Sequence, residues 1–270
     1  MQRSKPMTLD VAPAWFVQTK YRAGITRITE PYVHPLLRAS IWHLQGSDRD
    51  VFIDAGLGIA SLRNSFPHLF ARSPLLLLTH AHLDHAGGAY EFDDIGVHES
   101  EADEVRQPRA ASLYADALCK HLGTTLNVLG SRLPPVLLDA VPEEHFDIDS
   151  FHVRAAAATQ TLVENDSIDL GSRRLTVLEL PGHSPGSLGF LDSESGALFT
   201  GDALYDGTLL DDLAHSSATD YRATMTHLLS LEFAVAYPGH GPPLSPRKAR
   251  AICRKYLART QEEPTTSEHA

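Results

Sequence analysis

LLLLTHAHLDHAGG, residues 75–88, begins like a buried strand and ends in a cluster of polar side chains. Four leucines are followed by three histidines and an aspartate within six positions, which are His80, His82, Asp84 and His85. Imidazole and carboxylate groups crowded at the end of an apolar strand are costly to desolvate unless they bind something. Such a cluster is expected by chance in roughly one chain of this composition in a few hundred. The stretch therefore predicts a metal site.

Three later segments share this design, because each is an apolar run that ends beside glycine in a residue type that binds metals. They are LELPGHSPGS (178–187) with His183, ALFTGDALYDG (197–207) with Asp202, and AVAYPGHGPP (234–243) with His240. Loops at strand ends can point side chains into one cleft. We therefore expect these three residues to join the first cluster.

The rest of the chain contains two groups of strand-like runs with a helical region between them. The predicted strands lie within 24–29, 40–46, 50–56, 74–80 and 95–99, and then within 150–157, 173–182, 187–193, 196–202 and 233–241. Two or three short helices are expected in the region between the groups, and longer helices at 218–233 and 245–260. Ser245 is a candidate N-cap for the last helix, with Pro246 at its first position.

Composition limits the class of protein. The formal net charge of −11 and a pI near 5.7 oppose nonspecific binding to nucleic acid. Two cysteines are too few for a disulfide framework, and the chain has no evident export signal, so we expect a cytoplasmic protein. It has no run of 18 consecutive apolar residues, so we expect no transmembrane segment. We predict one domain over residues 1–260, with a helical insertion at about 104–150, and a disordered tail over 261–270.

These motifs, together with Asp54 in FIDAGLG (52–58), resemble the metallo-β-lactamase superfamily in kind and in order. The resemblance extends over residues 40–241. It implies an α/β fold, the αββα sandwich, in which two mixed β-sheets pack face to face and helices cover both outer faces. The active site of this fold lies at one edge of the sandwich.

The resemblance also implies a site for two zinc ions, although iron or manganese would suit the same side chains. The implied ligands are His80, His82 and His183 for the first ion, Asp84, His85 and His240 for the second, and Asp202 as the bridge. Asp54 is expected to support the histidine loop by hydrogen bonds. Two zinc ions would provide hydroxide at neutral pH, with Asp84 and Asp202 as the catalytic carboxylates.

Several branches of the superfamily fit the chain poorly. Two-zinc β-lactamases generally carry Cys or His where this chain has Asp202, and they are usually exported. Flavodiiron proteins carry Glu at the position of His82. The RNA-processing branches fit poorly with the acidic composition and with the lack of an evident basic appendage.

A metal-dependent hydrolase of thioesters is the preferred hypothesis, and an acyl-coenzyme A is the preferred substrate. Outside the ligands, the sequence resembles a small group of acyl-coenzyme A thioesterases, most weakly over 104–150. A thiolate can leave without a strong general acid. An N-acyl homoserine lactonase or other lactonase, a glyoxalase II-like hydroxyacylglutathione hydrolase, and a persulfide dioxygenase with one iron on His80, His183 and Asp202 remain alternatives. A metal-stabilised binding domain is the non-catalytic alternative.

Contacts with the substrate are less well defined by the sequence. Tyr205 and Asp206 follow Asp202 closely enough to be candidates for substrate contact, with an ordinary surface turn as the alternative. His215 is close enough in the chain to reach the cleft. Five leucines in the insertion either line an acyl channel or form helix core, and they are Leu113, Leu118, Leu122, Leu126 and Leu129.

Overall fold

The computed structural model describes residues 9–122 and 133–259. The predicted tail over 261–270 and two of the insertion leucines, Leu126 and Leu129, lie outside these ranges. In the part of the chain that is described, no helix is both long enough and apolar enough to span a membrane.

Two mixed β-sheets form the centre of the molecule, and the strands of the first follow one another in chain order. Its pairs are antiparallel from β1 to β4 and parallel from β4 to β7. Its seven strands are β1 (Val17–Lys20), β2 (Ile25–Thr29), β3 (Ile41–Leu44), β4 (Val51–Ile53), β5 (Leu75–Leu77), β6 (Ile95–His98) and β7 (Gln160–Leu162).

The second sheet has the order β12-β11-β10-β9-β8. All its pairs are antiparallel except β11 with β12, which is parallel. Its strands are β8 (Ser167–Asp169), β9 (Arg174–Glu179), β10 (Leu188–Asp192), β11 (Ala197–Gly201) and β12 (Val235–Pro238).

The main core lies between the two sheets. Trp42 of the first sheet packs edge-on against Phe199 and Tyr237 of the second, with ring centroids 5.9 Å and 4.9 Å away. Alternate residues of β4 point to opposite sides, so Ile53 enters this core while Phe52 packs under the outer helices. Strands buried on both faces explain why the sequence shows continuous apolar runs there.

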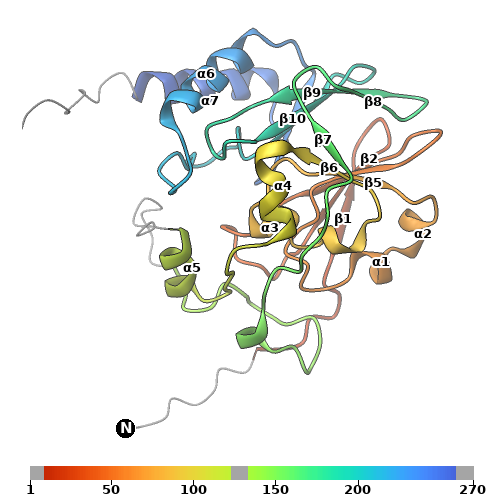
Figure 1. Cartoon of the computed structure of the whole chain (residues 1–270), viewed down its shortest axis with the longest axis vertical. Coiled ribbons are helices and arrows are strands. Elements are labelled where there is room, and N and C mark those ends of the chain that lie inside the picture. Colours follow the sequence, from red (N-terminus) through yellow and green to blue (C-terminus); the bar gives the residue numbers. More distant parts are fainter. Residues whose placement is uncertain (1–8, 123–132, 260–270) are drawn as a thin grey trace, which may run out of the picture.

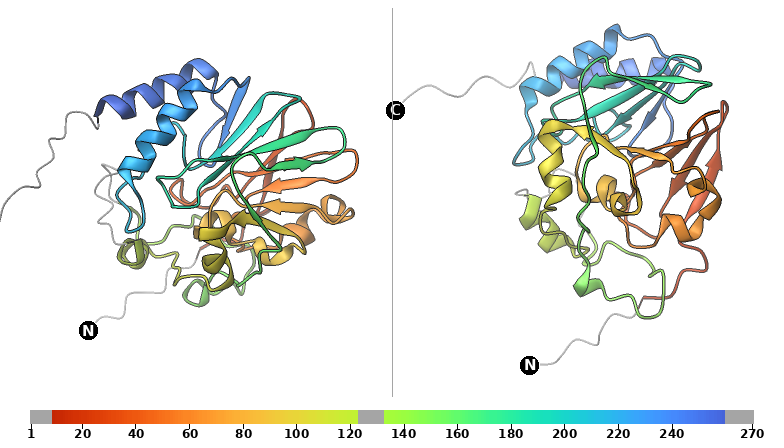
Figure 2. Two further views of the ribbon diagram at one scale, coloured as in Figure 1. Left: turned by 45° about the horizontal axis from the view of Figure 1, so that its top comes forward. Right: turned by 45° about the vertical axis from the view of Figure 1, so that its right-hand side comes forward.

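Helices cover both outer faces, as Figures 1 and 2 show. Four short helices pack on the first sheet: α1 (Leu62–Ser65), α2 (Pro67–Phe70), α3 (Leu83–Ala86) and α4 (Glu99–Arg106). The longer helices α6 (Ala218–Ser230) and α7 (Pro246–Arg259) pack on the second sheet. The predicted αββα sandwich is therefore confirmed. Ser245 also acts as predicted, since its hydroxyl accepts from the amide of Lys248 at 3.3 Å.

The structure differs from the predicted strands in two ways. Residues 150–157 form no strand, because this segment runs along α4, where the amide of Ala156 donates to Val105, and the chain joins the sheet only at β7. Strands β1, β7 and β8 were not predicted. All four residues of β1 are exposed and so show no alternation of buried and exposed side chains, and β7 and β8 contain three residues each.

Among the described residues, α4 and α5 (Ala115–Leu122) lie between the two strand groups, where two or three short helices were predicted. The insertion also contains the short 3-10 helix η3 (Ile148–Ser150), whereas residues 133–147 form turns and isolated bridges. Leu113 and Leu137 from this region pack against Trp15 and Val33 of the N-terminal part. The assignment of residues 1–260 to one domain stays a prediction.

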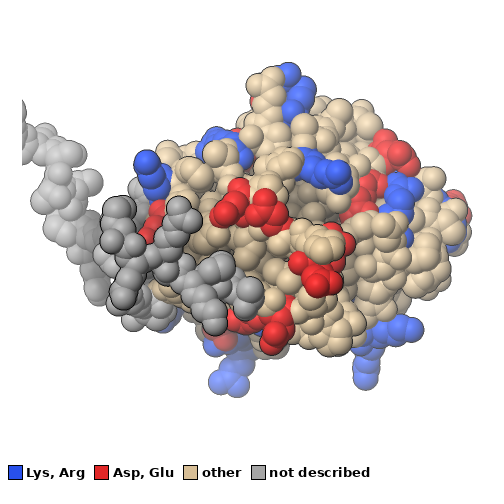
Figure 3. Space-filling model, turned by 90° about the horizontal axis from the view of Figure 1, so that it is seen from below, with Lys and Arg blue, Asp and Glu red and all other residues tan. Residues whose placement is uncertain are grey.

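The face that lies lowest in Figure 1 is shown in Figure 3. Several acidic side chains lie near its middle, and its Lys and Arg side chains are scattered rather than gathered in one patch. This distribution matches the negative net charge of the chain.

Candidate metal centre

The structure brings all seven predicted ligand residues together at one edge of the sandwich. Each comes from a loop or short helix that follows a strand, because the carboxyl ends of β5, β11 and β12 open toward the same edge. Their ligand atoms form three overlapping groups, within each of which the atoms lie no more than 4.8 Å apart: His80 with His82 and His183, His80 with His85 and Asp202, and Asp84 with His85 and His240.

Three imidazoles meet in the first group. Nδ1 of His82 lies 3.0 Å from Nε2 of His80 and 2.9 Å from Nε2 of His183. The outer nitrogen of His183 lies 3.0 Å from the carbonyl oxygen of Leu210, which can only accept, so Nδ1 carries the proton. The lone pair on Nε2 of His183 therefore faces the group, as a metal ligand requires.

Asp84, His85 and His240 form the second group, which lies next to Asp202 and in which imidazoles face carboxylates. Nε2 of His240 lies 3.2 Å from Oδ2 of Asp84 and 3.4 Å from Oδ2 of Asp202. Nε2 of His85 lies 3.3 Å from Oδ1 of Asp202. Asp202 also faces the first group, because its Oδ2 lies 3.6 Å from Nε2 of His183.

Two buried atoms at this junction have no hydrogen-bond partner, namely Nε2 of His85 and Oδ1 of Asp202. Buried polar atoms are rarely left unsatisfied in a folded protein, so these atoms point to a ligand. Nitrogen and carboxylate oxygen are donors that suit zinc and iron. The residues present therefore fit a metal centre.

Asp54 forms hydrogen bonds within the histidine loop. Its Oδ1 accepts from the amide of Thr79 at 2.8 Å, and its Oδ2 lies 2.7 Å from Nδ1 of His85. The hydroxyl of Thr79 donates to Asp54 and lies 3.0 Å from Nδ1 of His80. Asp54 thus supports two of the histidines, one directly and one through Thr79.

Glu101 was not singled out by the sequence analysis, yet it joins two loops of the site. It is 5% exposed and lies on α4. Its Oε2 accepts from the amide of Ala81 at 3.1 Å, and its Oε1 accepts from the amide of Gly186 at 2.9 Å. Ala81 lies between His80 and His82, so the carboxyl group ties the histidine loop to the loop after β9. Backbone partners so far apart in sequence leave no motif that could have indicated this role.

His215 reaches the cleft, which the sequence analysis raised as an option. Its Nε2 lies 2.7 Å from Nε2 of His82, and its Nδ1 lies 3.1 Å from a guanidinium nitrogen of Arg109. His82 thus faces the other imidazoles with one nitrogen and His215 with the other.

The electrostatics of the two groups differ. Burial and then the neighbouring histidines hold the pKa values of His80 and His82 well below the usual range, so both imidazoles are neutral, the form that binds metals. Burial alone would lower the pKa of His240, but Asp202 and Asp84 outweigh it and raise that pKa to about 10. Burial alone would raise the pKa of Asp202. His240 and His85 outweigh this effect and hold that pKa well below its usual range.

Glycine permits the close approach of β12 to the site. A Cβ atom at Gly239 would lie 2.3 Å from Oδ1 of Asp202 and 2.8 Å from Cε1 of His85. No side chain fits in that space, so the glycine before His240 is required by packing rather than by the turn alone.

Two pockets flank the metal centre. One lies beside His240 and Asp202 and is lined in part by Tyr205, Asp206 and Leu36. The hydroxyl of Tyr205 donates to the carbonyl of Thr208 at 2.6 Å, and Asp206 is exposed and paired with Lys248 at 3.0 Å. Both predicted contact candidates therefore line a pocket next to the site.

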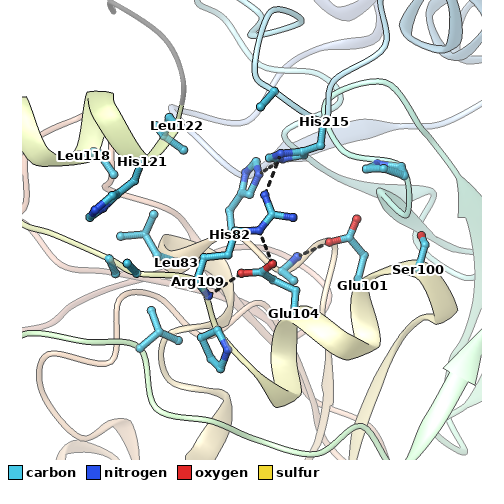
Figure 4. Close-up of a pocket in the computed structure, with 17 residues that line it drawn as sticks. His82, Leu83, Ser100, Glu101, Glu104, Arg109, Leu118, His121, Leu122 and His215 are labelled. Atoms are coloured by element: carbon cyan, nitrogen blue, oxygen red, sulfur yellow. Dashed lines mark hydrogen bonds and ion pairs between the residues drawn. The ribbon is translucent and has the colours of Figure 1, made fainter.

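The other pocket lies beside His82 and His215, between α4 and α5 (Figure 4). Leu118 and Leu122 project into it from α5, while Glu101 and Glu104 come from α4. Leu113 and Leu118 are both buried core residues, and of the two only Leu118 also lines the pocket.

Comparisons with known proteins agree with this architecture. The sequence model of a protein family described as the metallo-beta-lactamase superfamily matches residues 74–240. The chain is 31% identical over 264 residues to the Homo sapiens protein named acyl-coenzyme A thioesterase MBLAC2, covering 91% of this chain and 88% of that one.

Solved structures give the same result. The metallo-beta-lactamase family protein TTHA1429 from Thermus thermophilus is similar with a TM-score of 0.63 at 24% identity, over 88% of this chain and 79% of that one. TTHA1623, solved in a di-iron-bound form, is similar with a TM-score of 0.51 at 25% identity, over 78% of this chain and 91% of that one. The chain therefore belongs to the metallo-β-lactamase superfamily and is a hydrolase of that family.

Proposed function

We propose that this protein is a dinuclear zinc thioesterase that hydrolyses acyl-coenzyme A. The observation that carries the metal part is the junction of the two groups, where buried Nε2 of His85 and Oδ1 of Asp202 face one another without a hydrogen bond. The substrate part rests on the relatives, since the MBLAC2 proteins of three species are named acyl-coenzyme A thioesterases and match 91% of the chain.

In this proposal seven side chains hold two ions. His80, His82 and His183 would hold the first, Asp84, His85 and His240 would hold the second, and Asp202 would contribute to both. Two zinc ions, when bound, would make a water-derived nucleophile available at neutral pH and would polarise the thioester carbonyl. Iron and manganese are alternatives for metal analysis to test, since TTHA1623 has been solved with two irons.

The chain's own residues hold this arrangement in place. Asp54 accepts the Nδ1 proton of His85, so Nε2 of that ring is free to bind. Leu210 does the same for His183 through its carbonyl oxygen. Asp84 orients the nucleophile. Asp202, which lies between His183 and His240, would help to orient it. Tyr205 and Asp206 are proposed to contact the substrate on the side of His240.

A thioester suits a site built in this way. A thiol has a pKa of about 8.5, so its thiolate departs without a strong general acid, whereas an amine or alkoxide leaving group needs one. Tyr205 is a poor acid for that purpose, because burial and the charge of Asp202 raise its pKa well above its ordinary value. A site of metal ligands and apolar walls is therefore sufficient for thioester cleavage.

The test combines metal analysis with a substrate panel. Purified protein is expected to hold two zinc ions per chain and to release thiol from acyl-coenzyme A faster than from a hydroxyacyl glutathione thioester. Rapid opening of an acyl homoserine lactone without thiol release from any thioester would favour the lactonase. One iron per chain with oxygen uptake on a persulfide would favour the dioxygenase.

A matched pair of variants separates the site from the fold. Asp202→Asn is expected to lower kcat by at least a hundredfold, while Asp212→Asn, at an exposed position in the same loop region, leaves it unchanged. Equal activity in the two variants would rule out the bridging role of Asp202.

A cytoplasmic location stays a prediction. Cys119 and Cys253 are both free thiols, which is common in reducing compartments.

A further inference from the structure

The pocket between α4 and α5 is an apolar recess that opens directly beside the first group of histidines. Ala81 and His82 form its inner end. The apolar side chains that line it include Leu83, Ala110, Ala111, Leu118, Leu122 and Val153. Figure 4 shows the α5 side chains on one side of the recess and the α4 side chains on the other.

The charged groups around this recess already have partners. Arg109 pairs with Glu104 at 2.6 Å through Nε and contacts His215 through another guanidinium nitrogen. Both oxygens of Glu101 accept backbone amides. Arg109 is already paired with a carboxylate, and two acidic residues line the recess. The described residues of the recess therefore offer no free cation to bind a phosphate group. An alkyl chain, which needs no polar partner, suits its walls.

One pocket lies beside His82 of the first group, and the other lies beside His240 of the second group. A substrate bound between the groups would therefore place one of its halves in each pocket. An acyl thioester whose carbonyl carbon sits between the groups sends its acyl chain to one side and its sulfur to the other. Both pockets have largely apolar walls, and the recess beside His82 is the more enclosed of the two, so an alkyl chain is better shielded from water there. The pocket beside His240 contains Asp202 and the exposed, polar turn around Asp206 and Thr208.

We propose that the recess beside His82 binds the acyl chain of the thioester, and that Ala111 and Leu122 set the length of chain that is accepted. This inference rests on the proposed thioesterase function. It makes the insertion a specificity element, because α5 and the segment before it supply one wall of the recess.

Two substitutions change the recess in opposite directions without touching the predicted ligands. Ala111→Phe places a ring in the recess from a partly exposed position, and Leu122→Ala removes a partly buried side chain from its wall. Burial of each methylene is worth about fourfold in binding. Ala111→Phe is therefore expected to lower kcat/KM for dodecanoyl-coenzyme A at least tenfold and for acetyl-coenzyme A less than twofold. Leu122→Ala is expected to move the preference toward longer chains.

Matched controls come from α2 and the residue that follows it, neither of which lines the recess. Ala71→Phe changes an exposed alanine after α2, and Leu69→Ala changes a partly buried leucine on that helix. Neither lines the recess, so both are expected to keep the wild-type profile across acetyl-, butanoyl-, octanoyl- and dodecanoyl-coenzyme A.

Binding of S-dodecyl-coenzyme A, a thioether that cannot be hydrolysed, gives a second readout by calorimetry. Ala111→Phe is expected to weaken it at least tenfold relative to Ala71→Phe. Thiol release by the wild type, with a chain-length profile that neither recess variant alters, would overturn the acyl recess but keep the thioesterase. Absence of thiol release from every coenzyme A ester would overturn both.

Discussion

Replacement of Glu101 by Gln should loosen the metal centre without removing any predicted ligand. The carboxyl group is 5% exposed and accepts from the amides of Ala81 and Gly186, at 3.1 Å and 2.9 Å. An amide has only one oxygen, so its NH2 group must face one of the two backbone N–H donors. One hydrogen bond to a carboxylate is lost and one buried donor is left unsatisfied.

The expected loss of stability follows from those two effects. A hydrogen bond to a charged group contributes about 1.5–3 kcal/mol, and an unsatisfied buried donor costs about 1–3 kcal/mol. The two overlap, so we expect a decrease in the free energy of unfolding of about 2–4 kcal/mol. For a domain of this size that corresponds to a fall in Tm of roughly 5–15 °C. Because Ala81 lies between His80 and His82, metal affinity should fall about 10–100-fold.

Thermal unfolding and competition with a chelator measure the two effects. Asp103→Asn is the matched control, because Asp103 lies on the same helix, is exposed and pairs only with Arg106 among the contacts that the structure gives for its side chain. An exposed ion pair of this kind contributes about 0–1 kcal/mol. If Glu101→Gln were as stable and as tightly metallated as Asp103→Asn, the proposed tie between the two loops would be wrong.

Three further outcomes are expected. Asp54→Asn should weaken metal binding about 10–100-fold in the same chelator assay, because the ring of His85 loses the carboxylate that orients it, and unchanged affinity would contradict that role. Removal of metal by a chelator should lower Tm, and zinc at ~100 times its Kd should raise the free energy of unfolding by about 2.7 kcal/mol. A Tm that does not change when zinc is added would argue against a resident ion. Cys253 should resist a thiol reagent at pH 8, where Cys119 reacts, because burial raises the pKa of the Cys253 thiol to about 11 and thiolate is the reactive form; modification of both at equal rates, followed by mass spectrometry, would refute this.

The elements that sequence predicts best are those in which the physical signal is local. Strand β5 and the histidines after it lie within one short stretch, and the continuous leucines reflect burial on both faces of the sheet. The ligands after β9, β11 and β12 were identified because each strand ends beside glycine and a metal-binding side chain. Gly239 makes the reason visible, since no larger residue fits against Asp202 there.

The elements that sequence misses depend on partners distant in the chain. The hydrogen bonds of the Glu101 carboxyl group within the described residues go to backbone amides of two loops, and nothing in the neighbouring sequence indicates these partners. Strand β1 is fully exposed and is held by its pairing with β2 rather than by burial. Residues 150–157 have the composition of a strand, yet the position of α4 draws Ala156 into a hydrogen bond outside the sheet.

The metal centre draws its residues from both sheets. His80 follows β5 in the first sheet, and Asp202 follows β11 in the second, with the whole insertion between them in the chain. An ion held by both would close a loop of more than a hundred residues, as a covalent cross-link does, and would lower the chain entropy that unfolding gains. Separation of the two sheets would then require release of the ion, so the rate of metal exchange in the native protein sets an upper limit on how often the halves of the sandwich part.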